Sequence, residues 1–173
     1  SDNYFEDFEV GAVYQHARGK TITALDNVLI TYMVLNTADG HFNEDRMARL
    51  GKSFGGGKIV SYGGVNFSMV LGLASQDCCE NALAELGLDN VKLTRPVTHG
   101  DTIYAYSEVL EKREADRDDA GIVVFRHYGV NQDREQIAQL DRTVLSKRRS
   151  HWVGCPSMRI EPDAYAVAGE GAG

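Results

Sequence analysis

The chain has 173 residues, with 18 Lys and Arg against 25 Asp and Glu, and a net charge of −7 at pH 7. This length suits one domain, and 43% hydrophobic with 25% charged residues excludes a disordered or collagen-like chain. The acidic balance argues against binding to nucleic acid or an anionic membrane surface, because both attract positive charge. We expect one folded domain over residues 1–160 and a flexible, Gly- and Ala-rich tail over 161–173.

The three cysteines do not form a disulfide framework or a metal-binding pattern. Their number is odd, Cys78 and Cys79 are adjacent, and Cys155 stands apart without the spacing of a metal site. The chain also opens without a signal-peptide pattern and has no apolar run long enough for a membrane span. We therefore expect reduced thiols, no bound metal and a cytoplasmic protein.

The first half of the chain is predicted to be partly helical. After an extended segment that turns at Gly11, Thr23 and Asp26 have the spacing of a capping box. Apolar residues at helical spacing then predict an amphipathic helix over 24–35. Residues 36–58 are predicted to form a long, partly helical excursion with a short helix over Glu44–Leu50, and long loops of this kind often carry function.

The next segment, 65–74, is apolar almost all round and predicts a buried helix. A further helical turn is expected over 81–86, ended by Gly87. Four β-rich stretches follow, at 91–93, 102–110, 122–130 and 137–146, with a solvated hairpin tip over 111–119. This order predicts an α+β fold in which the buried helix lies across one face of a curved antiparallel sheet.

Among the five histidines, His41 has the most polar surroundings. The amide and carboxylate side chains within five residues of it are Asn36, Asp39, Asn43, Glu44 and Asp45. Carboxylates can orient an imidazole and raise its basicity, which suits a general base near neutral pH. The alternative is a polar loop in which Asn43 caps a helix. His127 lies in an alternating strand and is expected to be half-exposed, and His16 and His151 are also expected to be structural.

Two other features could bind a ligand. Gly63 and Gly64 precede the buried helix, where unpaired amides without a Cβ in the way suit a developing oxyanion, although a tight turn would explain them equally well. Lys147, Arg148 and Arg149 form the one dense positive run of the sequence. They could bind a phosphate-bearing cofactor or simply end a strand.

The order of several motifs resembles that of MaoC-like dehydratases, which include the (R)-specific enoyl-CoA hydratases. The matching pieces, over roughly residues 4–150, are Tyr4–Gly11 (YFEDFEVG), Thr21–Thr23, Phe54–Gly56, Ile59–Gly64 (IVSYGG), Arg95–Val97 and Gly100–Thr102. The resemblance implies a hot-dog fold, in which a long central helix is wrapped by a curved antiparallel sheet. It also implies a homodimer, or a higher oligomer of dimers, with the acyl-CoA channel between two subunits.

The family's catalytic pair is Asp-x4-His, and this sequence matches it imperfectly. His41 is the preferred histidine, with Asn36 at the acid's spacing or Asp39 as its partner. An alignment counted back from Phe54 instead puts Ala38 and Asn43 at the pair, which would remove both groups. The resemblance also assigns the thioester oxyanion donor to Gly63 or Gly64. The residues expected to contact substrate are Tyr62, Asn43, Lys147 and Arg148.

The resemblance implies a hydratase or dehydratase that adds water reversibly to an α,β-unsaturated acyl-CoA. It needs no metal or redox cofactor, and CoA arrives as part of the substrate. The altered pair suggests an unusual acyl group such as a branched C5 dicarboxylic ester (mesaconyl-, itaconyl- or methylmalyl-CoA), whose carboxylate Arg95 or Arg18 could face. The alternatives are a hot-dog thioesterase and a non-catalytic acyl-CoA-binding subunit.

Overall fold

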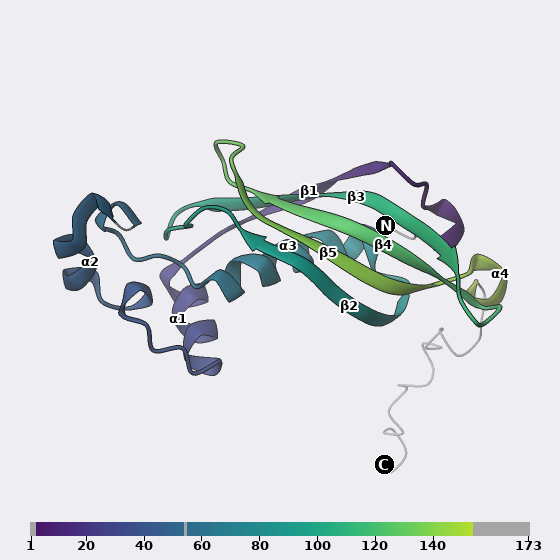
Figure 1. Ribbon diagram of the computed structural model, residues 1–173, viewed down its shortest axis with the longest axis horizontal. Coiled ribbons are helices and arrows are strands. Elements are labelled where there is room, and N and C mark those ends of the chain that lie inside the picture. The colour runs from purple at the N-terminus through teal and green to yellow at the C-terminus, as the bar shows by residue number, and fades with distance from the viewer. Residues whose placement is uncertain (1–2, 54, 154–173) are drawn as a thin grey trace, which may run out of the picture.

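A curved antiparallel sheet lies against one long helix in the computed structural model, which describes residues 3–53 and 55–153 (Figure 1). The five strands are β1 (Val13–Thr21), β2 (Ala82–Leu93), β3 (Thr102–Glu114), β4 (Ala120–Val130) and β5 (Gln136–Lys147). They are hydrogen-bonded in the order β1-β3-β4-β5-β2, so β1 and β2 form the two edges. The predicted α+β arrangement is confirmed. Cys155 and the predicted tail over 161–173 lie outside the described residues.

The long helix α3 (Gly63–Cys78) packs one face against the sheet. Its buried stripe includes Val65, Val70 and Ala74. Gly129 of β4 allows a close approach, because a Cβ there would lie 2.4 Å from Cγ2 of Val70. The opposite stripe is exposed, at Ser68, Gly72 and Gln76. The prediction of a helix buried all round is therefore wrong for a single chain, because the sheet covers only one side of it.

Helix α1 (Ala24–Met33) begins where the sequence predicted, but it buries the face that was not expected. The capping box is present, since Asp26 N–H donates to Thr23 and the Asp26 carboxylate accepts from the Thr23 amide at 2.8 Å. Asn27 and Thr31 are fully buried, whereas Leu25 is 65% exposed. The Thr31 hydroxyl bonds to Oδ1 of Asn27 at 3.2 Å. The Thr31 hydroxyl is thus satisfied within the helix, whereas the Asn27 amide bonds to segments outside it.

The excursion between α1 and α3 extends past one end of the sheet (Figure 1). It contains helix α2 (Glu44–Leu50), at the predicted position, with Oδ1 of Asn43 accepting from Arg46 N–H at 2.9 Å as its N-cap. Three short 3₁₀ turns complete it, at Asp39–His41, Gly51–Ser53 and Gly55–Gly57. Phe54, which lies between the last two turns, is not among the residues that the structure describes.

Several boundaries differ from the sequence prediction. Residues 81–86 are not helical, because β2 begins at Ala82 and pairs with β5, for example Gly87 with Thr143. Cross-strand pairing there outweighs the helix propensity of Ala, Leu and Glu. The tip expected over 111–119 is shorter, since β3 continues to Glu114. The extended N-terminal segment contains a 3₁₀ turn at Phe5–Asp7.

The C-terminal end of the sheet leads into α4 (Arg149–Trp152). This short helix lies at the opposite end of the molecule from α1 and α2 (Figure 1). None of the helices in the described part of the chain has the length and apolar character needed to cross a membrane.

Candidate functional site

His41 ends a 3₁₀ turn in the excursion and is held by backbone groups. Its own amide donates to Ala38 O at 3.0 Å, and its ring Nδ1 lies 2.7 Å from Val60 O. Val60 N–H in turn donates to Gly40 O at 3.0 Å. The segment before α3 therefore fixes both the loop and the imidazole, which is only partly buried.

This contact determines which nitrogen of His41 can act as a base. A carbonyl oxygen only accepts, so Nδ1 carries the proton that it donates to Val60. In the neutral ring, Nε2 then holds the lone pair. A general base needs such a nitrogen within hydrogen-bond reach of the proton it removes. His41 therefore presents a basic Nε2 without the help of a carboxylate.

The predicted acid partners of His41 bond elsewhere. The Asp39 carboxylate pairs with Arg46 at 2.7 Å, and Asn36 Oδ1 accepts from the Ala38 amide at 3.0 Å. Asn43, which an alternative alignment puts at the histidine position, caps α2 and is exposed. Of the residues predicted around the base, the structure brings Tyr62 to it, with ring centroids 5.7 Å apart in an edge arrangement.

The other half of the candidate site is the N-terminus of α3. Gly63 and Gly64 supply the first two amides of the helix, and the first bond back to Tyr62 O comes from Val65 N–H at 2.9 Å. The amides of a first turn lack partners within the helix and carry partial positive charge. A Cβ on Gly64 would lie 2.3 Å from the Tyr62 ring, so glycine is required for this close packing.

A residue that the sequence did not single out joins these two halves. Asn27, fully buried in α1, donates from Nδ2 to His41 O at 3.0 Å and accepts at Oδ1 from the Tyr62 amide at 2.9 Å. The one available signal was a polar residue next to the capping Asp26 and four positions before Thr31. Helical periodicity instead assigned Asn27 to the solvent-exposed face of the helix, opposite the apolar residues.

Two other histidines form a closed cluster beside the C-terminal end of α3. His16 contacts Asp77 at 2.6 Å and Ser107 at 2.7 Å, and Ser107 contacts His127 at 2.6 Å. Both histidines are buried, so the prediction of a half-exposed His127 is wrong. One potential ligand atom each of Cys78, His16 and His127 lies within 4.8 Å of the other two, as in a metal site. The Ser107 hydroxyl, however, already bonds to both imidazole rings. Of the four ring nitrogens in this cluster, three are within hydrogen-bond distance of Asp77 or Ser107, and Nε2 of His127 is not bonded to any residue in the described part of the chain.

Burial sets the protonation states of this cluster. It lowers the pKa of His127 to about 3 and raises the pKa of the Cys78 thiol to about 12. His127 is therefore neutral and Cys78 is a thiol at neutral pH. Among the described residues, Nε2 of His127 is a buried atom without a hydrogen-bond partner.

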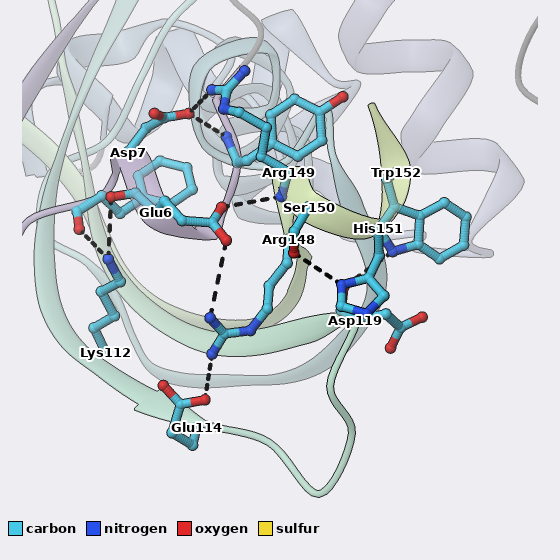
Figure 2. Close-up of polar contacts among 12 residues, drawn as sticks. Glu6, Asp7, Lys112, Glu114, Asp119, Arg148, Arg149, Ser150, His151 and Trp152 are labelled. Carbon is cyan, nitrogen blue, oxygen red and sulfur yellow. Dashed lines mark hydrogen bonds and ion pairs between the residues drawn. The ribbon is translucent and has the colours of Figure 1, made fainter. Parts of the chain in front are cut away.

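The basic run at the end of β5 lies far from His41 within one chain. Lys147 N–H bonds to Asn81 O, just beyond the C-terminal end of α3, and a helix of 16 residues is about 24 Å long. Arg148 pairs with Glu6 and Glu114, and Arg149 pairs with Asp7 (Figure 2). The charges of the two arginines are thus matched by acids of the same chain, whereas Nζ of Lys147 lies over the Trp152 ring, 5.1 Å from its centroid.

Two hollows on the described surface lie away from His41. The larger, about 650 Å³, includes Tyr104 and Tyr106 on the face of β3 that points away from α3. The smaller, about 370 Å³, lies beside α2 and includes Lys58 and His99. His41 does not line either of these two hollows.

Comparisons with known proteins agree on one family. The model of the mesaconyl-CoA hydratase family matches residues 2–148. The chain is 34% identical to a mesaconyl-CoA hydratase of Haloarcula marismortui, over 84% of the chain and 42% of the relative. It is 32% identical to a β-methylmalyl-CoA dehydratase of Chloroflexus aurantiacus, over 86% of the chain and 46% of the relative. The chain therefore spans less than half the length of these curated relatives.

Solved structures agree with the fold. A MaoC domain protein dehydratase from Chloroflexus aurantiacus superposes with a TM-score of 0.75 at 28% identity, over 92% of this chain and 44% of that one. A double hot-dog protein from Mycobacterium tuberculosis superposes with a TM-score of 0.75 at 20% identity, over 97% of this chain and 52% of that one. The hot-dog fold and the MaoC-like resemblance predicted from the sequence are confirmed.

Proposed function

Because the chain belongs to the mesaconyl-CoA hydratase family, we propose that it carries a hydro-lyase site for α,β-unsaturated acyl-CoA thioesters. The observation that carries this proposal is the pairing of His41 with the start of α3. Nδ1 of His41 is held by Val60 O, which leaves Nε2 as a base beside Tyr62, the residue before the Gly63 and Gly64 amides.

In this proposal His41 Nε2 removes a proton from water, and the water oxygen forms a bond to the β-carbon. The electron pair of the double bond moves to the thioester oxygen as an enolate, which the Gly63 or Gly64 amide stabilises. The α-carbon then takes the proton from the imidazolium, and the reverse sequence eliminates water. The imidazole and the amides supply every group the step needs, so we propose no metal or redox cofactor.

The substrate class we propose is a branched C5 dicarboxylic acyl-CoA of the mesaconyl, itaconyl or methylmalyl type. Its support is the relatives' names, mesaconyl-CoA hydratase and β-methylmalyl-CoA dehydratase. Arg95, proposed to face the carboxylate, lies 3.3 Å from Glu135 and is more than half exposed. A substrate carboxylate would compete with that pair. Arg18 lies exposed on β1 as a second choice.

We propose that a second hot-dog unit, a second copy of this chain, completes the site. Two observations support it: one stripe of α3 is exposed, and edge strand β2 leaves Leu86, Leu88 and Val91 on the surface. A long apolar edge strand is a template for pairing. The free thiols of Cys78 and Cys79 suit a reducing compartment such as the cytoplasm.

To test this proposal, the parent protein and the His41→Ala variant are each incubated with crotonyl-CoA and with mesaconyl-CoA. The absorbance of the enoyl thioester and the amount of free thiol are measured. Hydration lowers the absorbance of the conjugated enoyl thioester without freeing thiol, and His41→Ala abolishes it. Release of CoA thiol would instead indicate a thioesterase. Hydration by His41→Ala at the parent rate would show that another group is the base.

A second candidate is a non-catalytic unit that binds acyl-CoA for a catalytic partner. The observation that favours it is the amide at Asn36 where the family has an acid. This candidate predicts that calorimetry detects binding of mesaconyl-CoA while neither absorbance nor thiol changes.

A further inference from the structure

Asn27 occupies an unusual position for a polar side chain. It is fully buried in α1, and both ends of its amide bond to backbone groups of other segments. Nδ2 donates to His41 O, 14 residues later, and Oδ1 accepts from the Tyr62 amide, 35 residues later. One side chain thus bridges the turn that carries the base and the residue that precedes the helix amides.

The partners of Asn27 fix its orientation and its chemical identity. His41 O can only accept and Tyr62 N–H can only donate, so a flipped amide would place like groups against each other at both ends. Aspartate would put a carboxylate oxygen against His41 O, and alanine would leave two partly buried backbone groups without this partner. Such groups cost free energy when buried without a partner.

We infer that Asn27 is a positioning residue that sets the distance between the His41 base and the oxyanion donors at Gly63 and Gly64; this inference rests on the proposed function. Val60 O holds the ring, whereas Asn27 holds the backbone of the same residue and ties it to α3. The side chain that links the His41 turn to α3 is therefore an amide on α1. Asp39, the acid nearest to His41 in the sequence, is bonded to Arg46 instead.

The decisive variant is Asn27→Asp. A misplacement of about 1 Å at a reacting group can lower a rate by about 100-fold, so we expect kcat to fall about 100-fold near pH 8 while KM changes less than about 3-fold. Protonation of the introduced carboxylate should restore kcat, because its O–H can then donate to His41 O while its C=O accepts from the Tyr62 amide. The ratio of variant to parent kcat should therefore rise as the pH falls.

The matched control is Asn81→Asp. Asn81 is also a buried amide, and its Nδ2 donates to a carbonyl, Asn3 O, at 3.1 Å near the far end of α3. This variant should lower the melting temperature by a similar amount without the loss of kcat or its recovery at low pH. An equal loss of kcat in both variants, or a kcat ratio for Asn27→Asp that stays flat with pH, overturns the inference.

A measurement without turnover separates this inference from the proposed function. The ¹⁵N shifts of the His41 imidazole should show the Nδ1–H form in the parent and a mixture of the two forms in Asn27→Asp. If the parent turns over no substrate but the shifts change as expected, the proposed function fails and the positioning role of Asn27 stands. Unchanged shifts overturn that role even if the enzyme is active. If Asn27→Asp does not fold, Asn27→Ala should show the same shift change and a loss of kcat without recovery at low pH.

Discussion

His41 and His16 lie beside opposite ends of α3 and use their imidazoles in different ways. His16 has the carboxylate neighbour that the sequence led us to expect for His41, since Asp77 lies 2.6 Å from its Nδ1 and Ser107 closes its other nitrogen. His41 has a backbone carbonyl on Nδ1 and keeps Nε2 for a ligand. A histidine with both nitrogens engaged and 4% exposure stabilises a fold. One open nitrogen suits catalysis.

The His16 cluster resembles the order of an acid–base–hydroxyl triad, yet its position excludes that role in this conformation. Ser107 is fully buried between the sheet and α3. The cluster joins β1, α3, β3 and β4 through Asp77, His16, Ser107 and His127. Its hydrogen bonds fix the packing of the helix on the sheet.

Replacing each of the two histidines separately by glutamine should give the largest effects and distinguish the catalytic role from the structural one. His41→Gln should lower kcat by about 1,000-fold, within the range for loss of a general base, and leave the melting temperature nearly unchanged. His16→Gln should lower the melting temperature instead, because it breaks a buried hydrogen-bonded network. Thermal unfolding and the hydration assay on both variants check this. A catalytic loss in folded His16→Gln as large as that in His41→Gln would remove the distinction.

The closed cluster should also make stability depend on pH. Burial lowers the pKa of His127 to about 3 from an ordinary 6.5, so below pH 6.5 the unfolded chain binds a proton that the folded chain resists. The contribution of His127 to the free energy of unfolding therefore keeps its full value above pH 6.5 and decreases as the pH falls toward 3. At pH 5 this decrease amounts to about 2 kcal/mol. Urea unfolding of the parent and of His127→Asn at pH 7 and pH 5 measures it. Equal pH dependence in the two proteins would contradict the assignment.

The open site should be sensitive to packing at the start of α3. Gly64→Ala places a Cβ 2.3 Å from the Tyr62 ring, which contacts His41 edge-on. Displacing that ring should lower kcat by about 10-fold, less than the cost of a full 1 Å misplacement. Kinetics together with the melting temperature test this. A variant of unchanged stability and full activity would show that the ring position does not matter for catalysis.

The smallest effect is expected at the basic run. Arg148 is engaged by Glu6 and Glu114 (Figure 2), so Arg148→Gln should change the free energy of unfolding by no more than about 1 kcal/mol and leave KM for acyl-CoA within about 2-fold. A much larger rise in KM, with the oligomer intact, would instead support the prediction that this cluster binds CoA phosphates, from the partner unit of a dimer.

The sequence by itself determined the elements whose signals are local. The Thr23–Asp26 capping box fixed the start of α1, Asn43 marked the start of α2, and alternation located β3, β4 and β5. Motif order over residues 4–150 identified the hot-dog family, and the glycine pair marked the start of α3. The caps, the alternation and the glycine pair depend on residues within a few positions of one another, and the order of motifs is itself a property of the linear sequence, so no knowledge of tertiary contacts was needed.

The tertiary structure alone decided which faces and partners these elements have. Residues 82–90 became a strand because β5 lies beside them, and α1 turned Asn27 inward because His41 O and the Tyr62 amide needed partners. Asp77 reached His16 across 61 residues, while Asp39, two residues from His41, bonded to Arg46. Proximity in sequence does not determine side-chain contacts in a folded chain, because burial and pairing choose the partner in space.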